Sequence, residues 1–175
     1  MISTTGRKAV RDASPRIEPA RFPKDTEAVR ALFREYESAA GVPACFQGFE
    51  HELAELPGVY EPPAGALLVA RDAGGALVGC VALKPAGDGT AEIKRLFIRA
   101  PARGQGLGRR LALSALEAAR SARYRRVVLE THGSMQAAQA LLRELGFKPH
   151  GAKKKGGDAA VIRMALNLAD TKPEG

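Results

Sequence analysis

The apolar residues of this chain recur with two different spacings, and the alternation between the spacings predicts the order of its elements. A short first strand fits residues 16–20. An amphipathic helix then runs from Pro23 to about Ala40 and ends at Gly41, because apolar residues follow one another there at intervals of three and four positions: Val29, Leu32, Phe33 and Tyr36. Residues 42–64 contain four prolines and predict irregular chain with one short helix over 48–56.

Strand-like runs dominate the middle of the chain. Residues 66–71 and 76–84 are apolar and are joined by Asp72-Ala-Gly-Gly75, which predicts a hairpin. A second turn at Gly87-Asp-Gly89 leads into a central strand from Ala91. Three antiparallel strands are therefore expected in succession.

The second half returns to alternating strands and helices. The central strand stops at Pro101, and a helix follows from Leu107 to about Arg123. A strand over 127–131 precedes a helix that Ser134 is expected to cap and that ends at Leu145. A closing hairpin is expected from residues 148–152 and 159–168, around a turn at 156–158. The pattern predicts a mixed α/β fold.

Composition limits the class of protein. The chain has 175 residues, which suits one domain over 16–168 between an N-terminal arm, residues 1–15, and a C-terminal tail, residues 169–175. No apolar run approaches the ~20 residues of a membrane span, and the first residues lack an apolar signal segment, so a cytoplasmic protein is expected. Two cysteines, Cys45 and Cys80, are too few for a disulfide scaffold, and no cluster predicts a metal site. Cys80 is expected in the core.

Charge adds one open question. The formal net charge is +8. Such a charge suits a nucleic-acid or anionic partner. An Arg-rich surface that serves mainly solubility explains it as well, and we favour that interpretation.

A glycine-rich loop carries the clearest chemical signal. Arg103-Gly104-Gln105-Gly106-Leu107-Gly108 lies between a predicted strand and a predicted helix. Its backbone N–H groups and the first turn of the helix suit a phosphate ligand. A P-loop would need Lys-Ser/Thr where Arg109-Arg110 stand, and the dinucleotide fingerprint would need its third glycine at Arg109. Nucleotide binding of those two kinds is therefore disfavoured.

The same loop resembles motif A of the GNAT superfamily, the acyl-CoA-dependent N-acetyltransferases, whose pattern is Arg/Gln-x-x-Gly-x-Gly/Ala. Arg103, Gly106 and Gly108 match its fixed positions. The later segment from Ala138 to Phe147 is similar to the family signature that ends in Gly-Phe, except that Leu142 replaces its tyrosine. The resemblance covers roughly residues 16–168.

This resemblance implies a three-layer α+β fold, with a mixed, mostly antiparallel sheet of about six or seven strands, about four helices and a cleft between central strands 4 and 5. Acetyl-CoA would be the co-substrate, and no metal is implied. The residues expected to bind it lie on the central strand, in the loop and before the next helix: Leu96, Phe97, Ile98, Arg103, Gly104, Gln105, Gly106, Leu107, Gly108, Arg109 and Ser134.

Acetyl transfer also requires that the acceptor amine lose a proton. For a lysine-like amine at pH 7 this costs about 4.6 kcal/mol. Glu92, just before the core of the central strand, is our first candidate for the base, with Glu130 and His132 as alternatives. An ion pair of Glu92 with Lys94, Arg95 or their neighbours is an equally open interpretation.

Other contacts are less certain from sequence. By resemblance, the segment before the second strand borders the acceptor, which implicates Phe46, Phe49 and Glu50, although core packing and a solvated helix face explain them too. Leu142 cannot donate the proton that the family tyrosine gives to the departing thiolate. Ser134 and Tyr124 are the nearest substitutes in sequence.

Three hypotheses on function follow. The leading one is an N-acetyltransferase that acts on a primary amine of a small molecule or a protein in a ternary complex. The second is a catalytically weak CoA-binding regulator, and the third is a nucleic-acid-associated basic protein. The sequence identifies neither the acceptor nor the oligomeric state, and an exposed edge strand leaves a homodimer open.

Overall fold

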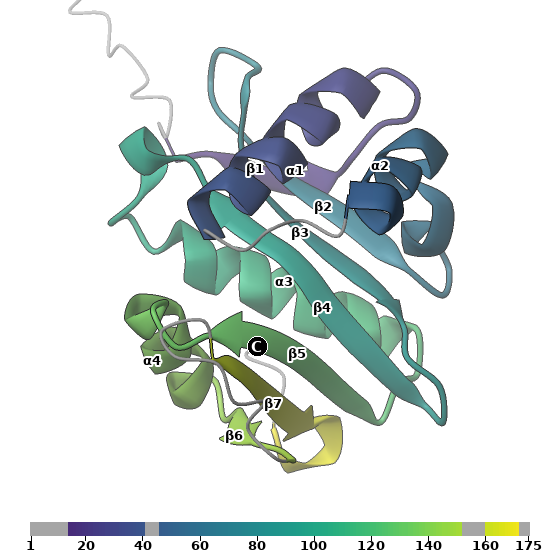
Figure 1. The fold of residues 1–175 in the computed structure, drawn as a ribbon, viewed down its shortest axis with the longest axis vertical. Helices are drawn as coiled ribbons and strands as arrows, with labels where there is room; N and C mark the ends of the chain where they lie inside the picture. Colours follow the sequence, from purple (N-terminus) through teal and green to yellow (C-terminus); the bar gives the residue numbers. More distant parts are fainter. Residues whose placement is uncertain (1–13, 41–45, 152–159, 172–175) are drawn as a thin grey trace, which may run out of the picture.

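A computed structural model describes residues 14–40, 46–151 and 160–171, without the side chains of residues 46 and 47. These residues form one mixed sheet of seven strands in the order β1-β2-β3-β4-β5-β7-β6, with four α-helices (Figure 1). The strands are β1 (Arg16–Pro19), β2 (Ala66–Arg71), β3 (Leu77–Pro85), β4 (Thr90–Ile98), β5 (Arg126–His132), β6 (Lys148–Pro149) and β7 (Val161–Asn167). The helices are α1 (Thr26–Ala40), α2 (Phe46–Glu55), α3 (Leu107–Ser121) and α4 (Gln136–Glu144). The predicted fold class is confirmed.

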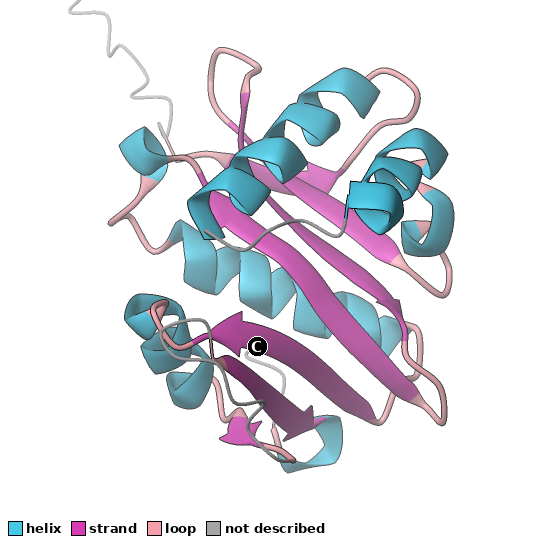
Figure 2. Cartoon of the chain, viewed as in Figure 1, coloured by secondary structure: helices cyan, strands magenta, loops and turns pink. Residues whose placement is uncertain are grey.

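The helices cover the sheet unequally. The first core cluster packs α3 and α4 against one face of the sheet, and the second packs α1 and α2 against the other face of β2, β3 and β4. Because alternate strand residues point to opposite faces, Val127 and Leu129 lie in the α3 core while Arg126, Val128 and Glu130 face the opposite way. Figure 2 shows that no described helix lies over that second face of β5 and β7. As far as the described residues go, this half of the sheet faces solvent.

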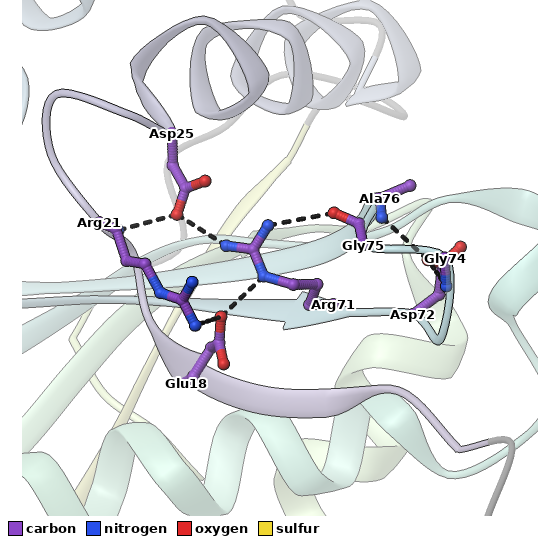
Figure 3. Close-up of polar contacts among 8 residues, drawn as sticks. All are labelled: Glu18, Arg21, Asp25, Arg71, Asp72, Gly74, Gly75 and Ala76. Carbon is purple, nitrogen blue, oxygen red and sulfur yellow. Dashed lines mark hydrogen bonds and ion pairs between the residues drawn. The ribbon is translucent and has the colours of Figure 1, made fainter. Parts of the chain in front are cut away.

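A half-buried arginine, Arg71, joins β1, β2 and the start of α1 (Figure 3). Arg71 donates to Glu18 at 2.7 Å and to Asp25 at 2.8 Å, and the same Asp25 oxygen accepts the backbone N–H of Arg21 at 2.8 Å. Burial of Asp25 by itself raises the pKa of its carboxyl, but the hydrogen bonds from Arg21 and Arg71 outweigh burial and lower that pKa below its usual value. The network fixes where α1 leaves the sheet edge.

Most predicted elements are found, and the differences have local causes. Ser134 does not cap α4, which begins two residues later with Met135 in the N-cap position and no side-chain hydrogen bond. Residues 133–135 form a turn instead, since Gly133 donates to the Ala160 carbonyl and Met135 to that of His132, both at 2.9 Å. That part of the prediction was wrong.

Some predicted features lie outside the described residues. They are residues 1–13 of the expected arm over 1–15, the end of α1 at Gly41, Cys45 and the turn at 156–158. Cys80 is fully buried, as predicted, and burial raises the pKa of its thiol to about 12. Among the described helices, none is long and apolar enough to cross a bilayer.

Candidate active site

The central feature of the structure is a split between two neighbouring strands. β4 pairs with β5 in parallel only from Thr90–Arg126 to Ile93–Leu129. Beyond these pairs the strands diverge toward α4 (Figure 1), and a hollow of about 630 Å³ opens between them, which we call the interstrand cleft. The expected cleft between the fourth and fifth strands is therefore present.

A β-bulge directs β4 away from β5. The register of β3 against β4 shifts between Cys80 and Ala82, so that one β3 residue faces both Arg95 and Leu96. Arg95 has a φ of 59°, in the left-handed region that few non-glycine residues adopt. The bulge also breaks the alternation of faces, because Lys94 and Arg95 both point away from the α3 core.

Aromatic rings and two carboxylates hold the Arg95 side chain, which is 8% exposed. Its guanidinium donates to Glu52 at 2.6 and 3.3 Å and also to Glu37. The rings of Phe33, Tyr36 and Phe49 lie 5.0–5.6 Å from its central carbon. Burial lowers the pKa of Arg95, and the two carboxylates balance the positive charge. The cluster forms the α1 wall of the interstrand cleft.

The glycine-rich loop lies at one end of this cleft. Gly104 and Gly106 have φ values of 78° and 72°, and Gly106 is the N-cap of α3 with no side-chain hydrogen bond to the first turn. The first backbone N–H groups of a helix lack intrahelical partners, so this end of α3 suits an anion. Arg103 lines the cleft and donates to the Ile98 carbonyl at 2.8 Å.

Gly108 has a packing role. A Cβ atom on this residue would lie 3.2 Å from Ile98 Cδ1 and 3.6 Å from Leu141 Cδ2. The tight helix–strand contact is therefore at Gly108 rather than at Arg109, where the dinucleotide fingerprint has its third glycine. Arg109 instead approaches Glu144 of α4 at 3.6 Å. The loop geometry agrees with motif A.

The free edge of β5 carries polar atoms that lack partners. Thr131 is 5% exposed, and its Oγ1 has no hydrogen bond to any described residue; the same holds for Nδ1 of His132. Both residues line the interstrand cleft, and Gln139 anchors their strand end by donating to the His132 carbonyl at 2.9 Å. Buried polar groups are normally hydrogen-bonded. These two atoms are exceptions among the described residues.

The three predicted candidates for the base lie around the same cleft. Glu92, Glu130 and His132 all line the interstrand cleft. Glu92 forms an ion pair across the sheet with Lys84 at 3.5 Å rather than with Lys94 or Arg95, and Glu130 pairs with Arg163 at 3.1 Å. All three candidates for the base therefore stay in reach of a ligand.

A second hollow, of about 870 Å³, lies on the open face of β4, β5 and β7, and we call it the sheet-face hollow. Glu92 lines it together with Lys84, Arg126 and Arg163. Among the described residues, Glu92 alone lines both hollows. Glu92 thus lies between the two hollows.

Several other predicted residues can now be placed. Leu96, Phe97, Ile98 and Ser134 line the interstrand cleft, and Leu142, 3% exposed, lines it where the family has tyrosine. Gly104, Gln105, Leu107 and Arg109 belong to the loop and the first turn of α3 rather than to the cleft lining.

The structure does not bring every candidate into the cleft. Phe49 is buried beneath Arg95, and Glu50 pairs with Arg34 at 2.7 Å on the surface, so neither is among the cleft-lining residues. The Phe46 side chain lies outside the described part. Tyr124 donates to the Ala64 carbonyl at 2.7 Å, which commits its hydroxyl elsewhere.

Comparison with known proteins agrees with this geometry. Residues 26–147 match the model of the Acetyltransferase (GNAT) family. The chain belongs to the GNAT acetyltransferase family. An uncharacterized N-acetyltransferase of Schizosaccharomyces pombe is 36% identical over 154 residues, which cover 87% of this chain and 94% of that protein.

Solved structures show the same fold. A GNAT acetyltransferase of Staphylococcus aureus superposes with a TM-score of 0.75 at 15% identity, covering 87% of this chain and 98% of that one. A phosphinothricin acetyltransferase of Sinorhizobium meliloti, solved with acetyl-CoA, gives 0.70 at 20% identity, covering 93% and 95%. Members of this GNAT family transfer the acetyl group of acetyl-CoA to amines.

The cleft-lining residues that sequence reasoning missed include Tyr36, Glu37, Lys94 and Thr131. It assigned Tyr36 to the helix core, and its ring does pack edge-on against Phe97 at 6.2 Å. A polar residue at the end of a strand was the available signal for Thr131. Nothing local marks Glu37, because its role depends on Arg95, 58 residues away.

Proposed function

We propose that this protein transfers the acetyl group of acetyl-CoA to a primary amine by direct attack, with Glu92 as the general base. The observation that carries the proposal is the position of Glu92, which lines both hollows at the last strand pairs before the split. An acyl-CoA that occupied the interstrand cleft and an amine that entered from the sheet-face hollow would meet at this carboxylate.

The interstrand cleft offers each part of acetyl-CoA a matching surface. The uncapped start of α3 and Arg103 would take the pyrophosphate, where charge-assisted hydrogen bonds contribute roughly 1.5–3 kcal/mol each. The free backbone of β4 beyond Ile93 would pair with the pantetheine amides and place a donor near the thioester carbonyl. Thr131 on the opposite edge would supply one more donor.

Direct transfer then needs three events in this geometry. Glu92 removes a proton from the ammonium, directly or through water, and the amine nitrogen attacks the thioester carbon. The tetrahedral intermediate collapses as the C–S bond breaks, the attacking nitrogen releases its second proton, and CoA leaves as thiolate. Leu142 cannot protonate that sulfur, so the second proton reaches it through another cleft hydroxyl, such as that of Tyr36 or Thr131, or through water.

Steady-state kinetics on Glu92→Gln test the proposal, with release of free CoA as the readout and a panel of primary amines as acceptors. General-base catalysis typically contributes about 10²–10⁴-fold, so kcat should fall by about that factor at pH 7. The deficit should shrink as pH rises toward 10, where a growing fraction of the amine is already deprotonated, and the KM for acetyl-CoA should not change.

Two matched variants identify the base. Glu130→Gln and His132→Gln alter the alternatives in the same cleft. If either of them loses activity with the pH profile described, while Glu92→Gln retains it, the base has been misassigned. If the unmodified protein transfers acetyl to no amine, the proposed reaction itself fails.

A CoA-binding regulator is the second candidate, and the apolar Leu142 side chain in the cleft favours it. Tight binding of acetyl-CoA without transfer to any amine of the panel would support this alternative. Leu142→Tyr would then be expected to create activity.

A further inference from the structure

The sheet-face hollow contains more cationic groups than its carboxylates neutralise. Four cationic side chains line it, Lys84, Arg125, Arg126 and Arg163, against the carboxylates of Asp88, Glu92 and Asp170. Glu130 lies outside the lining but pairs with Arg163, so anion binding in this hollow depends on an individual cation that lacks a partner rather than on a net positive field.

Three of these cations are already engaged. Lys84 pairs with Glu92 at 3.5 Å, Arg163 pairs with Glu130 at 3.1 Å, and Arg125 donates to the Asp88 carbonyl at 3.4 Å. The Arg126 guanidinium makes no hydrogen bond or ion pair with any residue in the described ranges. Arg126 is half-buried and lines the hollow, so it is available to an anionic ligand that enters there.

Sheet register fixes where Arg126 lies relative to the proposed base. Arg126 pairs with Thr90 on one side and Asn167 on the other, whereas Glu92 pairs with Val128. Arg126 and Glu92 are thus diagonal neighbours on one face, with Cα atoms about 8 Å apart by strand spacing. Val128 and Ala165, opposite each other in register, form a small uncharged surface beside Glu92.

We propose that the acceptor is a primary amine that carries a carboxylate or phosphate group, and that Arg126 binds this anionic group while the amine reaches Glu92. The inference rests on the proposed acetyl transfer and specifies its substrate class. Arg126 is preferred over Lys94 as the anchor because Arg126 lines the sheet-face hollow, whereas Lys94 lines the interstrand cleft that acetyl-CoA would fill. A planar guanidinium also suits bidentate binding of either anion.

Matched acceptor pairs test the assignment. β-Alanine is compared with β-alaninamide, and phosphoethanolamine with ethanolamine, so that each pair differs in the anionic group and the two pairs separate carboxylate from phosphate. We expect kcat/KM to be higher for the anionic member of at least one pair. Arg126→Gln should lower kcat/KM for that acceptor by about 10- to 100-fold, as expected for one lost charge-assisted interaction, and leave the neutral member and the KM for acetyl-CoA unchanged.

Two further variants serve as controls. Arg143→Gln removes the same charge from an exposed position on α4 and should change neither acceptor. Lys94→Gln should retain the preference. Equal use of both members of each pair, or a preference that survives Arg126→Gln, overturns the inference and leaves the acetyltransferase proposal standing.

A binding measurement decides the case in which no acceptor of the panel turns over. Titration of the CoA-saturated protein with glutarate should shift the Nε–Hε NMR signal of Arg126, and glutaramide should not. An Arg126 signal left unchanged both by glutarate and by inorganic phosphate would contradict the proposed anion site independently of catalysis.

Discussion

Replacement of Arg95 by methionine tests how the wall of the interstrand cleft is held. Methionine keeps much of the apolar stem but removes every guanidinium contact. The change leaves Glu37 and Glu52, with side chains 20% and 18% exposed, facing each other without their shared cation. Removal of one partner of a buried ion pair costs about 3–5 kcal/mol, because the remaining charge is left uncompensated.

This loss converts into a thermal shift. For a chain of this size each kcal/mol corresponds to roughly 2–4 °C, so Arg95→Met should lower Tm by about 6–20 °C. The matched control is Arg34→Met, which removes the same side chain from an ion pair with Glu50 whose members are 54% and 56% exposed. Exposed pairs contribute about 0–1 kcal/mol, so the control should lower Tm by only a few degrees.

Calorimetric melting of the two variants beside the unmodified protein provides the measurement. Adding Glu37→Gln and Glu52→Gln to Arg95→Met should recover part of the loss, because the repulsion between the carboxylates is then absent. A Tm for Arg95→Met no lower than that of Arg34→Met would refute the reasoning, since Arg95 would then contribute no more than a surface arginine.

Three further predictions concern other parts of the fold. The pKa of Asp25 is lowered in the folded state, so its carboxylate stabilises the fold above the unfolded pKa near 3.9, and this contribution is lost as pH falls through the folded pKa. In urea unfolding, Asp25→Asn should have a smaller free energy of unfolding than the unmodified protein at pH 7, and the difference should vanish in acid. Gly106→Ala should cost about 1–2 kcal/mol in unfolding experiments, because the φ of 72° strains alanine although its Cβ would meet no atom within 4 Å. Thr131→Val should weaken acetyl-CoA binding about 2- to 10-fold in titration calorimetry. Its Tm should not fall, since the hydroxyl has no partner to lose among the described residues. Unchanged affinity with a lowered Tm would assign the hydroxyl a structural role instead.

Local patterns explain why most of the fold was predictable. The alternation of apolar residues in β5 and the spacing of three and four in α1 depend only on which face each element buries. Gly104 and Gly106 have a left-handed backbone, and glycine in the sequence indicates such a conformation because it adopts a positive φ readily. The loop between β4 and α3 could therefore be placed from its own residues.

The rest depends on contacts between segments distant in sequence. Arg95 looks like any charged strand residue, and its left-handed φ and burial follow from the bulge against β3 and from carboxylates on α1 and α2. The failed Ser134 cap has a similar origin, since the turn before α4 is fixed by a hydrogen bond to Ala160 next to β7. The ion pair of Glu92 with Lys84 likewise required the register of β3 and β4.

Titration calorimetry with acetyl-CoA, compared with NADH and ATP at moderate salt, tests the central claim most directly. The account predicts selective binding of acetyl-CoA, which Gly106→Ala should weaken and Glu92→Gln should leave unchanged. Preference for NADH would mean that the glycine loop binds dinucleotides, and binding of none of the three ligands would contradict the assignment of the interstrand cleft.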